Sequence, residues 1–265
     1  MSETKTRRVR LVVAYDGTDF CGWAPQEGER TVQSTLSLAL SEAADEGIDV
    51  VGASRTDSGA HAKGQVCHFD TTRPIRPEKW VRAANDLLPP DVAVVTAQVV
   101  PQDFHSRFWA VDRWYRYKIR CGPRDPFADR TAHGYGRELD LESMQLSAAF
   151  LVGSHDFFAF TQLLPPEANA VRELFSVRVS RVRDEVRVDI VGTAFARGMM
   201  RRIAGGLFEV GRGARSQESF AALLADGRGA RLHRPVVLPA KGLTLMRIRY
   251  GRSPREQVRT DPEDV

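Results

Sequence analysis

Hydrophobic and polar residues alternate in several short segments of the chain, a pattern typical of β-strands with one buried face. The segment 8–15 shows it clearly, with Val9, Leu11 and Val13 on one face and Arg8 and Arg10 on the other. Further strands are predicted at residues 48–52, 65–70, 92–100, 111–120, 174–182, 185–192 and 243–250.

Other segments repeat apolar residues every three or four positions, which indicates amphipathic helices. Thr31 is the predicted N-cap of a first helix that Gly47 ends. Pro77 begins a second helix, and Pro89 ends it. Further helices are predicted at residues 140–149, at 194–210 and in a short segment after residue 216.

Strands and helices intermingle in both halves of the 265-residue chain without a regular βαβ alternation. This order predicts an α+β fold of two subdomains, each an antiparallel sheet with helices on one face. We place the boundary after residue 107, which gives an N-terminal subdomain of residues 1–107 and a C-terminal subdomain of residues 108–265.

The composition is that of a water-soluble globular protein, with 42% apolar and 27% charged residues. No apolar run approaches the ~18 residues of a membrane span, and the polar N-terminus does not resemble a secretory signal. Cys21, Cys67 and Cys121 are far apart and odd in number, so neither a zinc site nor a disulfide framework is indicated. We therefore expect a cytoplasmic protein without a metal.

Arginine dominates the basic residues, although the net charge is only +4. Five of the 38 basic residues are lysine, and the other 33 are arginine. Arginine binds phosphate through two parallel hydrogen bonds and stacks on bases, which favours a nucleic-acid partner. A GC-rich genome also raises the arginine content, so composition leaves both explanations open.

The segment "GASRTDSGAHAKG" (residues 52–64) places Arg55 and Asp57 two positions apart among glycines. In extended backbone such residues project to the same side. The pair is either a surface ion pair or a catalytic carboxylate that a guanidinium keeps ionised. His61 and His68 lack a third ligand in the sequence, so we interpret them as hydrogen-bonded or phosphate-facing imidazoles.

The strand at 111–120 places Tyr115 and Tyr117 on one face and Arg116, Lys118 and Arg120 on the other. Tyrosines on a sheet face can stack on an unpaired base, and the basic face can hold a phosphate backbone. The alternative is that the tyrosines belong to the core and the basic face is solvated.

The helix predicted at 194–210 has an apolar stripe and, on another side, Arg197 and Arg201 one turn apart. Because the helix dipole disfavours cations near the N-terminus, arginine at Arg197 indicates an acidic partner such as phosphate. Ordinary surface arginines are the alternative. On the first interpretation, we expect His61 and Arg197 to contribute to substrate binding.

Seven segments, in this order, resemble the tRNA pseudouridine synthase A (TruA) family and together span residues 8–250. They are "YDGTDFCGW" (15–23), "TVQSTLSLAL" (31–40), "GASRTDSGAHAKGQVCHFD" (52–70), "FHSRFWAVDRWYRYKI" (104–119), "LVGSHDFFAF" (151–160), "TAFARGMMRRIAGGLFEVG" (193–211) and "KGLTLMRIRY" (241–250). The resemblance implies the pseudouridine synthase fold, in which two similar subdomains with antiparallel or mixed sheets join around a central cleft.

The resemblance also implies an isomerase that converts uridine to pseudouridine at positions 38, 39 and 40 of the tRNA anticodon stem-loop. It implies no cofactor and no metal, tRNA as the partner, and a homodimer. A synthase of the same fold that modifies another RNA and an RNA-binding or RNA-folding module without turnover are the alternatives.

Five residues correspond to functional positions of the family. Asp57 matches the catalytic aspartate, Arg55 the arginine two residues before it, Tyr115 the active-site tyrosine, Arg201 the arginine partner of the aspartate and Leu243 the pocket leucine. The resemblance thus implies that the N-terminal subdomain carries the aspartate loop and the C-terminal subdomain carries the tyrosine, the arginine and the RNA-binding surface.

The chain departs from the family pattern at six positions near these motifs. Ser54 replaces glycine, Ala60 valine, Ala24 glutamine, Thr193 asparagine, Ala196 an aliphatic residue and Arg197 histidine. None of these changes removes a charged or aromatic group assigned to the chemistry. They put the breadth of tRNA substrates in doubt.

Overall fold

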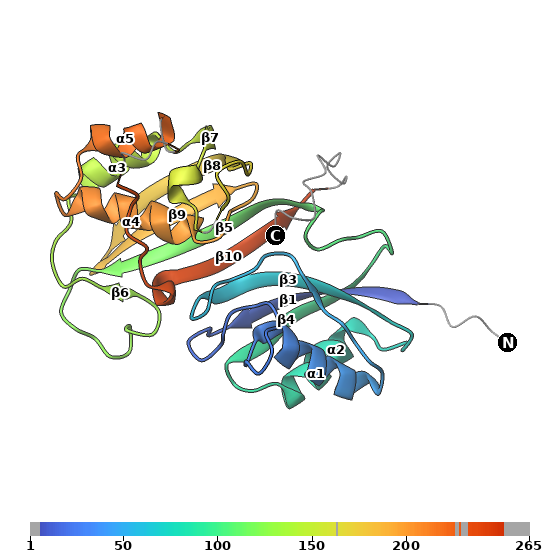
Figure 1. Ribbon diagram of the computed structural model, residues 1–265. Helices are drawn as coiled ribbons and strands as arrows, with labels where there is room; N and C mark the ends of the chain where they lie inside the picture. Colours follow the sequence, from blue (N-terminus) through green and yellow to red (C-terminus); the bar gives the residue numbers. More distant parts are fainter. Residues whose placement is uncertain (1–5, 163, 226–227, 229–232, 252–265) are drawn as a thin grey trace. The chain divides into compact units, whose positions relative to one another are not determined.

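A computed structural model describes residues 6–162, 164–225, 228 and 233–251 of the chain. These residues form two compact units (Figure 1). Unit 1 comprises residues 6–111 and 245–251, and unit 2 comprises the described residues between 112 and 244. The chain therefore contributes to unit 1 twice, before and after it forms unit 2. The roles predicted for residues 1–107 and 108–265 stay predictions.

Unit 1 is built on a sheet with the strand order β4-β1-β3-β10. Strand β1 pairs antiparallel with both β3 and β4, and the short β2 pairs antiparallel with β3. Figure 1 shows its two helices on one face of this sheet. The elements are β1 (Arg7–Tyr15), α1 (Val32–Ala44), β2 (Val51–Gly52), β3 (His61–Thr71), α2 (Pro77–Leu87), β4 (Val92–Val100) and, from residue 245 on, β10 (Leu243–Tyr250).

The core of unit 1 follows from the alternation in β1. Val9, Leu11 and Val13 are buried, and Leu11 lies opposite Cys67 in the register of β1 and β3. Strand β3 is buried on both of its faces over almost its whole length. The loops that cover its second face therefore have fixed positions, which matters for the functional residues that they carry.

Unit 2 has the antiparallel strand order β5-β9-β8-β7, and β6 pairs in parallel with β5, so the sheet is mixed. The chain is thus of the α+β class in both units. The elements are β5 (Ala110–Arg120), β6 (His133–Gly134), α3 (Leu141–Ala149), β7 (Gly153–Asp156), η1 (Phe158–Phe160), β8 (Val171–Val182), β9 (Glu185–Gly192), α4 (Met199–Gly211), α5 (Gln217–Ala225) and η2 (Ala240–Gly242).

Two predicted helix boundaries are wrong, and backbone conformation explains both. Helix α1 has the predicted N-cap, since the Thr31 hydroxyl accepts a hydrogen bond from an amide of the first turn, but the helix ends before Gly47 because Asp45 adopts a left-handed φ of 49°. Helix α4 begins at Met199, not at residue 194, because its N-cap Gly198 has a φ of 70°. Arg197 therefore precedes the helix, and the prediction that it lies on the first helical turn is wrong.

Residues 233–239, here called the strap, lie against α4. Its backbone carbonyl at Pro235 accepts a hydrogen bond from Arg202, and its amide at Val236 donates one to the Glu209 carboxylate. A Cβ atom at Gly205 would lie only 1.9 Å from the Val236 carbonyl oxygen, so glycine is what lets the strap approach the helix backbone. The strap leads directly into η2 and the start of β10.

Candidate active-site residues

The loop that contains Asp57, residues 53–60, connects β2 to β3 in unit 1. Thr56 is buried, whereas Arg55 is exposed and Asp57 is half-buried. The Thr56 hydroxyl lies 2.8 Å from the Tyr15 hydroxyl at the end of β1. Anchoring Thr56 inward leaves its two neighbours to project the other way, as the spacing of Arg55 and Asp57 predicts for extended backbone.

The segment 16–23 holds this loop from the outside through backbone hydrogen bonds. The Trp23 amide donates to the Thr56 carbonyl (3.2 Å), and the Phe20 carbonyl accepts from both the Gly59 amide (3.2 Å) and the Ser58 hydroxyl (3.2 Å). The Ala60 amide closes a turn onto the Asp57 carbonyl at 3.0 Å. The backbone on both sides of Asp57 is therefore fixed.

Two glycines make this close approach possible. A Cβ atom at Gly17 would lie 1.9 Å from the Ala60 carbonyl oxygen. At Gly22, φ is +89° and a Cβ atom would lie 2.7 Å from the Thr56 carbonyl oxygen. Residues other than glycine strain such a backbone or push the loop away.

His61 is buried at the start of β3 and holds the same segment. Its Nδ1 lies 3.0 Å from the Gly17 amide, which donates to it, and 3.2 Å from a carboxylate oxygen of Asp16. The histidine therefore links β3 to the segment that covers the Asp57 loop. Its predicted role in substrate binding stays a prediction.

In unit 2, Tyr115 and Tyr117 both lie on the buried face of β5. The Tyr115 ring packs edge-on against the Phe195 ring, with the ring centroids 5.2 Å apart. The Tyr117 hydroxyl donates to the Pro239 carbonyl of the strap at 2.7 Å, and burial raises the pKa of this phenol. Both tyrosine side chains are thus buried in unit 2, and a contact of Tyr115 with a base stays a prediction.

The opposite face of β5 is basic, as predicted, but it is partly neutralised within the sheet. Arg116 forms an ion pair with Asp189 at 2.9 Å, and the same carboxylate accepts a hydrogen bond from the Trp114 indole at 2.6 Å. Arg120 lies 3.5 Å from a carboxylate oxygen of Asp184.

Arg201 lies in the first turn of α4, and its Nε donates to the Leu238 carbonyl of the strap at 2.7 Å. Its positive charge opposes the rise in the pKa of Tyr117, which places the two groups near one another. Leu243 is buried and follows η2, where the strap ends. Unit 2 therefore gathers Tyr117, Arg201 and the approach to Leu243 around the strap.

Arg197 is exposed and lies just before α4, where its carbonyl accepts a hydrogen bond from the Gln162 amide at 2.9 Å. The structure thus groups Asp57, Arg55 and His61 in unit 1 and Tyr115, Arg201, Leu243 and Arg197 in unit 2. The catalytic and binding roles of these seven residues stay predictions.

Tyr15 and Thr56, which position the Asp57 loop, are not among the residues that the sequence indicated as functional. Tyr15 ends the buried stripe of β1, and a buried tyrosine hydroxyl usually finds a hydrogen-bond partner. That rule could have predicted a polar partner for Tyr15, but not that the partner is Thr56, 41 residues away.

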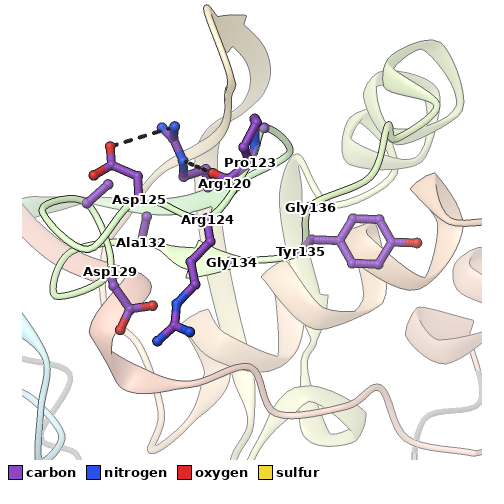
Figure 2. Close-up of a pocket in the computed structure, with 11 residues that line it drawn as sticks. Arg120, Pro123, Arg124, Asp125, Asp129, Ala132, Gly134, Tyr135 and Gly136 are labelled. Carbon is purple, nitrogen blue, oxygen red and sulfur yellow. Dashed lines mark hydrogen bonds and ion pairs between the residues drawn. The ribbon is translucent and has the colours of Figure 1, made fainter.

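A hollow of about 370 Å³ in unit 2 contains none of these residues (Figure 2). It is lined mainly by the loop 120–136, in which Arg120 donates to the Pro123 carbonyl and lies 3.6 Å from an Asp125 carboxylate oxygen. Lys241 pairs with Asp129 of the same loop at 2.8 Å. Arg120, Asp125 and Asp129 of this hollow are therefore all in ion pairs.

Within the part of the chain that the structure describes, no group of three or more His, Cys, Asp or Glu side chains is arranged to hold a metal ion. The three cysteines are not joined in disulfides. None of the described helices combines the length and the apolar character that crossing a bilayer requires.

Comparison with known proteins agrees with the sequence motifs. The profile of the tRNA pseudouridine synthase family matches residues 11–109 and 148–251. Proteins named tRNA pseudouridine synthase A from Syntrophotalea carbinolica and Shouchella clausii are 41% and 40% identical, each over 92% of this chain and over 96% and 94% of their own lengths. A chain from the crystal structure of a Cbf5-Nop10-Gar1 complex aligns with 89% of this chain and 48% of its own length. The TM-score of 0.36 and the identity of 10% are too low to support a conclusion about fold or function.

The profile matches most of the chain, and the match includes the Asp57 loop, the segment 16–23 that holds it, Arg201 and Leu243. The two relatives are aligned over nearly their whole lengths. The chain belongs to the tRNA pseudouridine synthase family.

Proposed function

We propose that this protein is an isomerase that converts uridine to pseudouridine in tRNA, at positions 38, 39 and 40 of the anticodon stem-loop. The observation that carries the proposal is the family match over residues 11–109 and 148–251, which contain all the candidate residues except Tyr115. The names of the aligned relatives and the arginine-rich composition support tRNA as the substrate.

The reaction balances without a cofactor. The bond between C1′ of the ribose and N1 of uracil breaks, and a bond between C1′ and C5 forms after the base turns. A proton leaves C5, and a proton is gained at N1. The target base must leave its stack first, which costs a few kcal/mol.

In this proposal Asp57 supplies the carboxylate that opens the glycosidic bond, either by covalent attack or by removing a proton from the ribose. Tyr115 contacts the everted base, and Arg201 matches the arginine that the family pairs with its aspartate. Leu243 supplies an apolar wall that excludes water. Arg55, Arg197 and His61 hold the RNA near the target nucleotide.

The test uses an unmodified tRNA transcript and carbodiimide mapping of pseudouridine. The wild-type protein should produce new reverse-transcription stops at positions 38 to 40. Asp57→Asn should abolish them while the tRNA dissociation constant stays within a few-fold. Asp86→Asn, which changes an exposed carboxylate on α2, is the matched control and should retain full activity.

Binding without any new stop in the wild-type reaction would reject the isomerase and support an RNA-binding module. Stops in ribosomal RNA fragments but not in tRNA would reject the substrate. Full turnover by Asp57→Asn would remove the aspartate from its role.

We also propose that the protein works as a homodimer in the cytoplasm, because a 29.5 kDa chain is small beside a tRNA. Light scattering after size-exclusion chromatography should give twice the chain mass. A mass of one chain at the concentration of the activity assay would contradict the homodimer.

A further inference from the structure

A rigid turn in unit 1, residues 104–109, covers the second face of β3. Buried Ser106 donates through its hydroxyl to the Val51 carbonyl of β2 at 2.8 Å and lies 2.9 Å from Nδ1 of His68 on β3. The Ser106 carbonyl accepts from the Tyr250 hydroxyl of β10 at 2.6 Å. The turn is therefore fixed to three strands, and one of them is the strand that leads into the Asp57 loop.

The interior of this turn is neutral. Burial lowers the pKa of His68 to about 4, and burial with nearby Arg8 and Arg107 lowers the pKa of His105. The charge of Arg8 is matched by Asp70, which accepts two hydrogen bonds from its guanidinium. At neutral pH, these two histidines are therefore uncharged, and their ring nitrogens accept hydrogen bonds within the turn.

The outer surface of the turn presents an arginine and an aromatic ring. Arg107 is exposed, and the Phe108 side chain retains 50% of its accessible surface. One side of the Phe108 ring packs on His105, with the centroids 4.2 Å apart. The Arg107 and Phe108 amides both donate to Nδ1 of His105, which fixes the backbone under both side chains.

Arg55 of the Asp57 loop contributes a second guanidinium near this surface. The Ser106 hydroxyl ties this turn to Val51, four residues before Arg55. Partial burial lowers the pKa of Arg107, and repulsion from the charge of Arg55 lowers it further. An anion that contacts both guanidiniums would relieve this repulsion. A phosphodiester suits them because guanidiniums bind phosphate oxygens in pairs.

A half-exposed phenylalanine beside two guanidiniums fits an unpaired nucleotide, because the ring can contact the base while the cations bind the phosphate. Its ring can stack on any base, because every base has a π-face. Two cations beside an aromatic ring match a backbone phosphate next to an unpaired base, and this combination favours RNA.

We propose that Arg107, Phe108 and Arg55 form an RNA-binding subsite, in which the guanidiniums hold a backbone phosphate and the Phe108 ring stacks on an unpaired base beside the target nucleotide. The proposal rests on the proposed function for the identity of the RNA. It adds a binding site on the turn 104–109 to the residues that the family motifs indicate.

The test measures binding of an unmodified anticodon stem-loop RNA at several salt concentrations. Arg107→Ala should weaken binding. It should also reduce the slope of log Kd against log salt concentration by about one unit, the value for one lost phosphate contact. Phe108→Ala should weaken binding about tenfold, and Phe108→Tyr should restore it. Arg82→Ala and Leu38→Ala, exposed positions on the helices of unit 1, are the matched controls and should leave both quantities unchanged.

A stem-loop with 2-aminopurine beside the target nucleotide reports stacking directly. Its fluorescence should be quenched by the wild-type protein and by Phe108→Tyr, and less by Phe108→Ala. Because Phe108→Ala could alter folding, its melting temperature is compared with that of the Leu38→Ala control.

The two failures can be told apart. If the wild-type protein forms pseudouridine while the Arg107 and Phe108 variants bind RNA like the controls, the subsite is overturned and the proposed function stands. If the variants lose affinity and salt dependence while the wild type forms no pseudouridine, the subsite stands and the isomerase proposal fails.

Discussion

One added methyl group at Gly22 would test whether the backbone around Asp57 sets the activity. The Cβ atom of Gly22→Ala would lie 2.7 Å from the Thr56 carbonyl oxygen, and ordinary contacts begin near 3.4 Å. The loop must therefore shift by about 0.7 Å, at the residue directly before the proposed catalytic carboxylate. A misplacement of ~1 Å can cost ~100-fold in rate, so we expect a 10- to 100-fold loss.

Gly28→Ala is the matched control for backbone strain. Gly28 also has a positive φ, of +74°, but a Cβ atom there would meet nothing within 4 Å. Both variants should lose about 1 kcal/mol of stability through the left-handed backbone. The clash at Gly22 should add ~1–3 kcal/mol.

The assay is single-turnover formation of pseudouridine at saturating enzyme, with urea denaturation in parallel. The reasoning predicts that only Gly22→Ala loses rate, while its tRNA affinity changes little. Equal rates for the two variants, or a wild-type rate for Gly22→Ala, would refute the idea that the position of Thr56 controls that of Asp57.

Three further predictions concern the stability of the two units. Tyr15→Phe and Thr56→Val should each cost ~1–3 kcal/mol in denaturant unfolding because a buried hydroxyl loses its partner, and the double variant should cost less than the sum; strict additivity would contradict the hydrogen bond. The pKa of His68 is about 4 in the folded protein and ~6.5 in the unfolded chain, so the free energy of unfolding should fall as the pH drops from about 6.5 to 4. His68→Gln should reduce the slope of that free energy against pH by the equivalent of up to one proton. An unchanged slope would show that His68 titrates normally. Gly205→Ala should destabilise the protein by ~1–3 kcal/mol through its clash with the strap, whereas Gly134→Ala, with open space around it, should lose less than 1 kcal/mol in the same thermal unfolding assay; equal losses would count against the close approach.

The strands were predictable because their signal is local. Strand β4 spans Val92–Val100, as its alternating and apolar residues indicate, and β5 extends the predicted strand by one residue. The start of α4 was not predictable from apolar periodicity. Phe195 continues the apolar spacing of the helix in the sequence, but the helix begins only after Gly198. A positive φ leaves no trace in hydrophobic spacing.

The candidate site was predictable in part. The spacing of Arg55 and Asp57 indicated a shared direction, and the burial of Thr56 between them agrees with it. The hydrogen bond from Thr56 to Tyr15 joins residues 41 positions apart, so only the fold reveals it. The roles of Tyr115 and Leu243 came from the family resemblance, since a buried tyrosine and a buried leucine look like ordinary core residues.

The return of the chain to unit 1 has a consequence for biosynthesis. Strand β10 lies beside β3 in the sheet of unit 1, and a Cβ atom at Gly64 would lie 2.6 Å from the Met246 carbonyl oxygen. At ~5–20 residues per second, a ribosome needs roughly 7 to 27 seconds to travel from residue 111 to residue 245. Throughout that interval the nascent N-terminal sheet lacks β10 beside β3, so the part of the protein that is translated first is completed last.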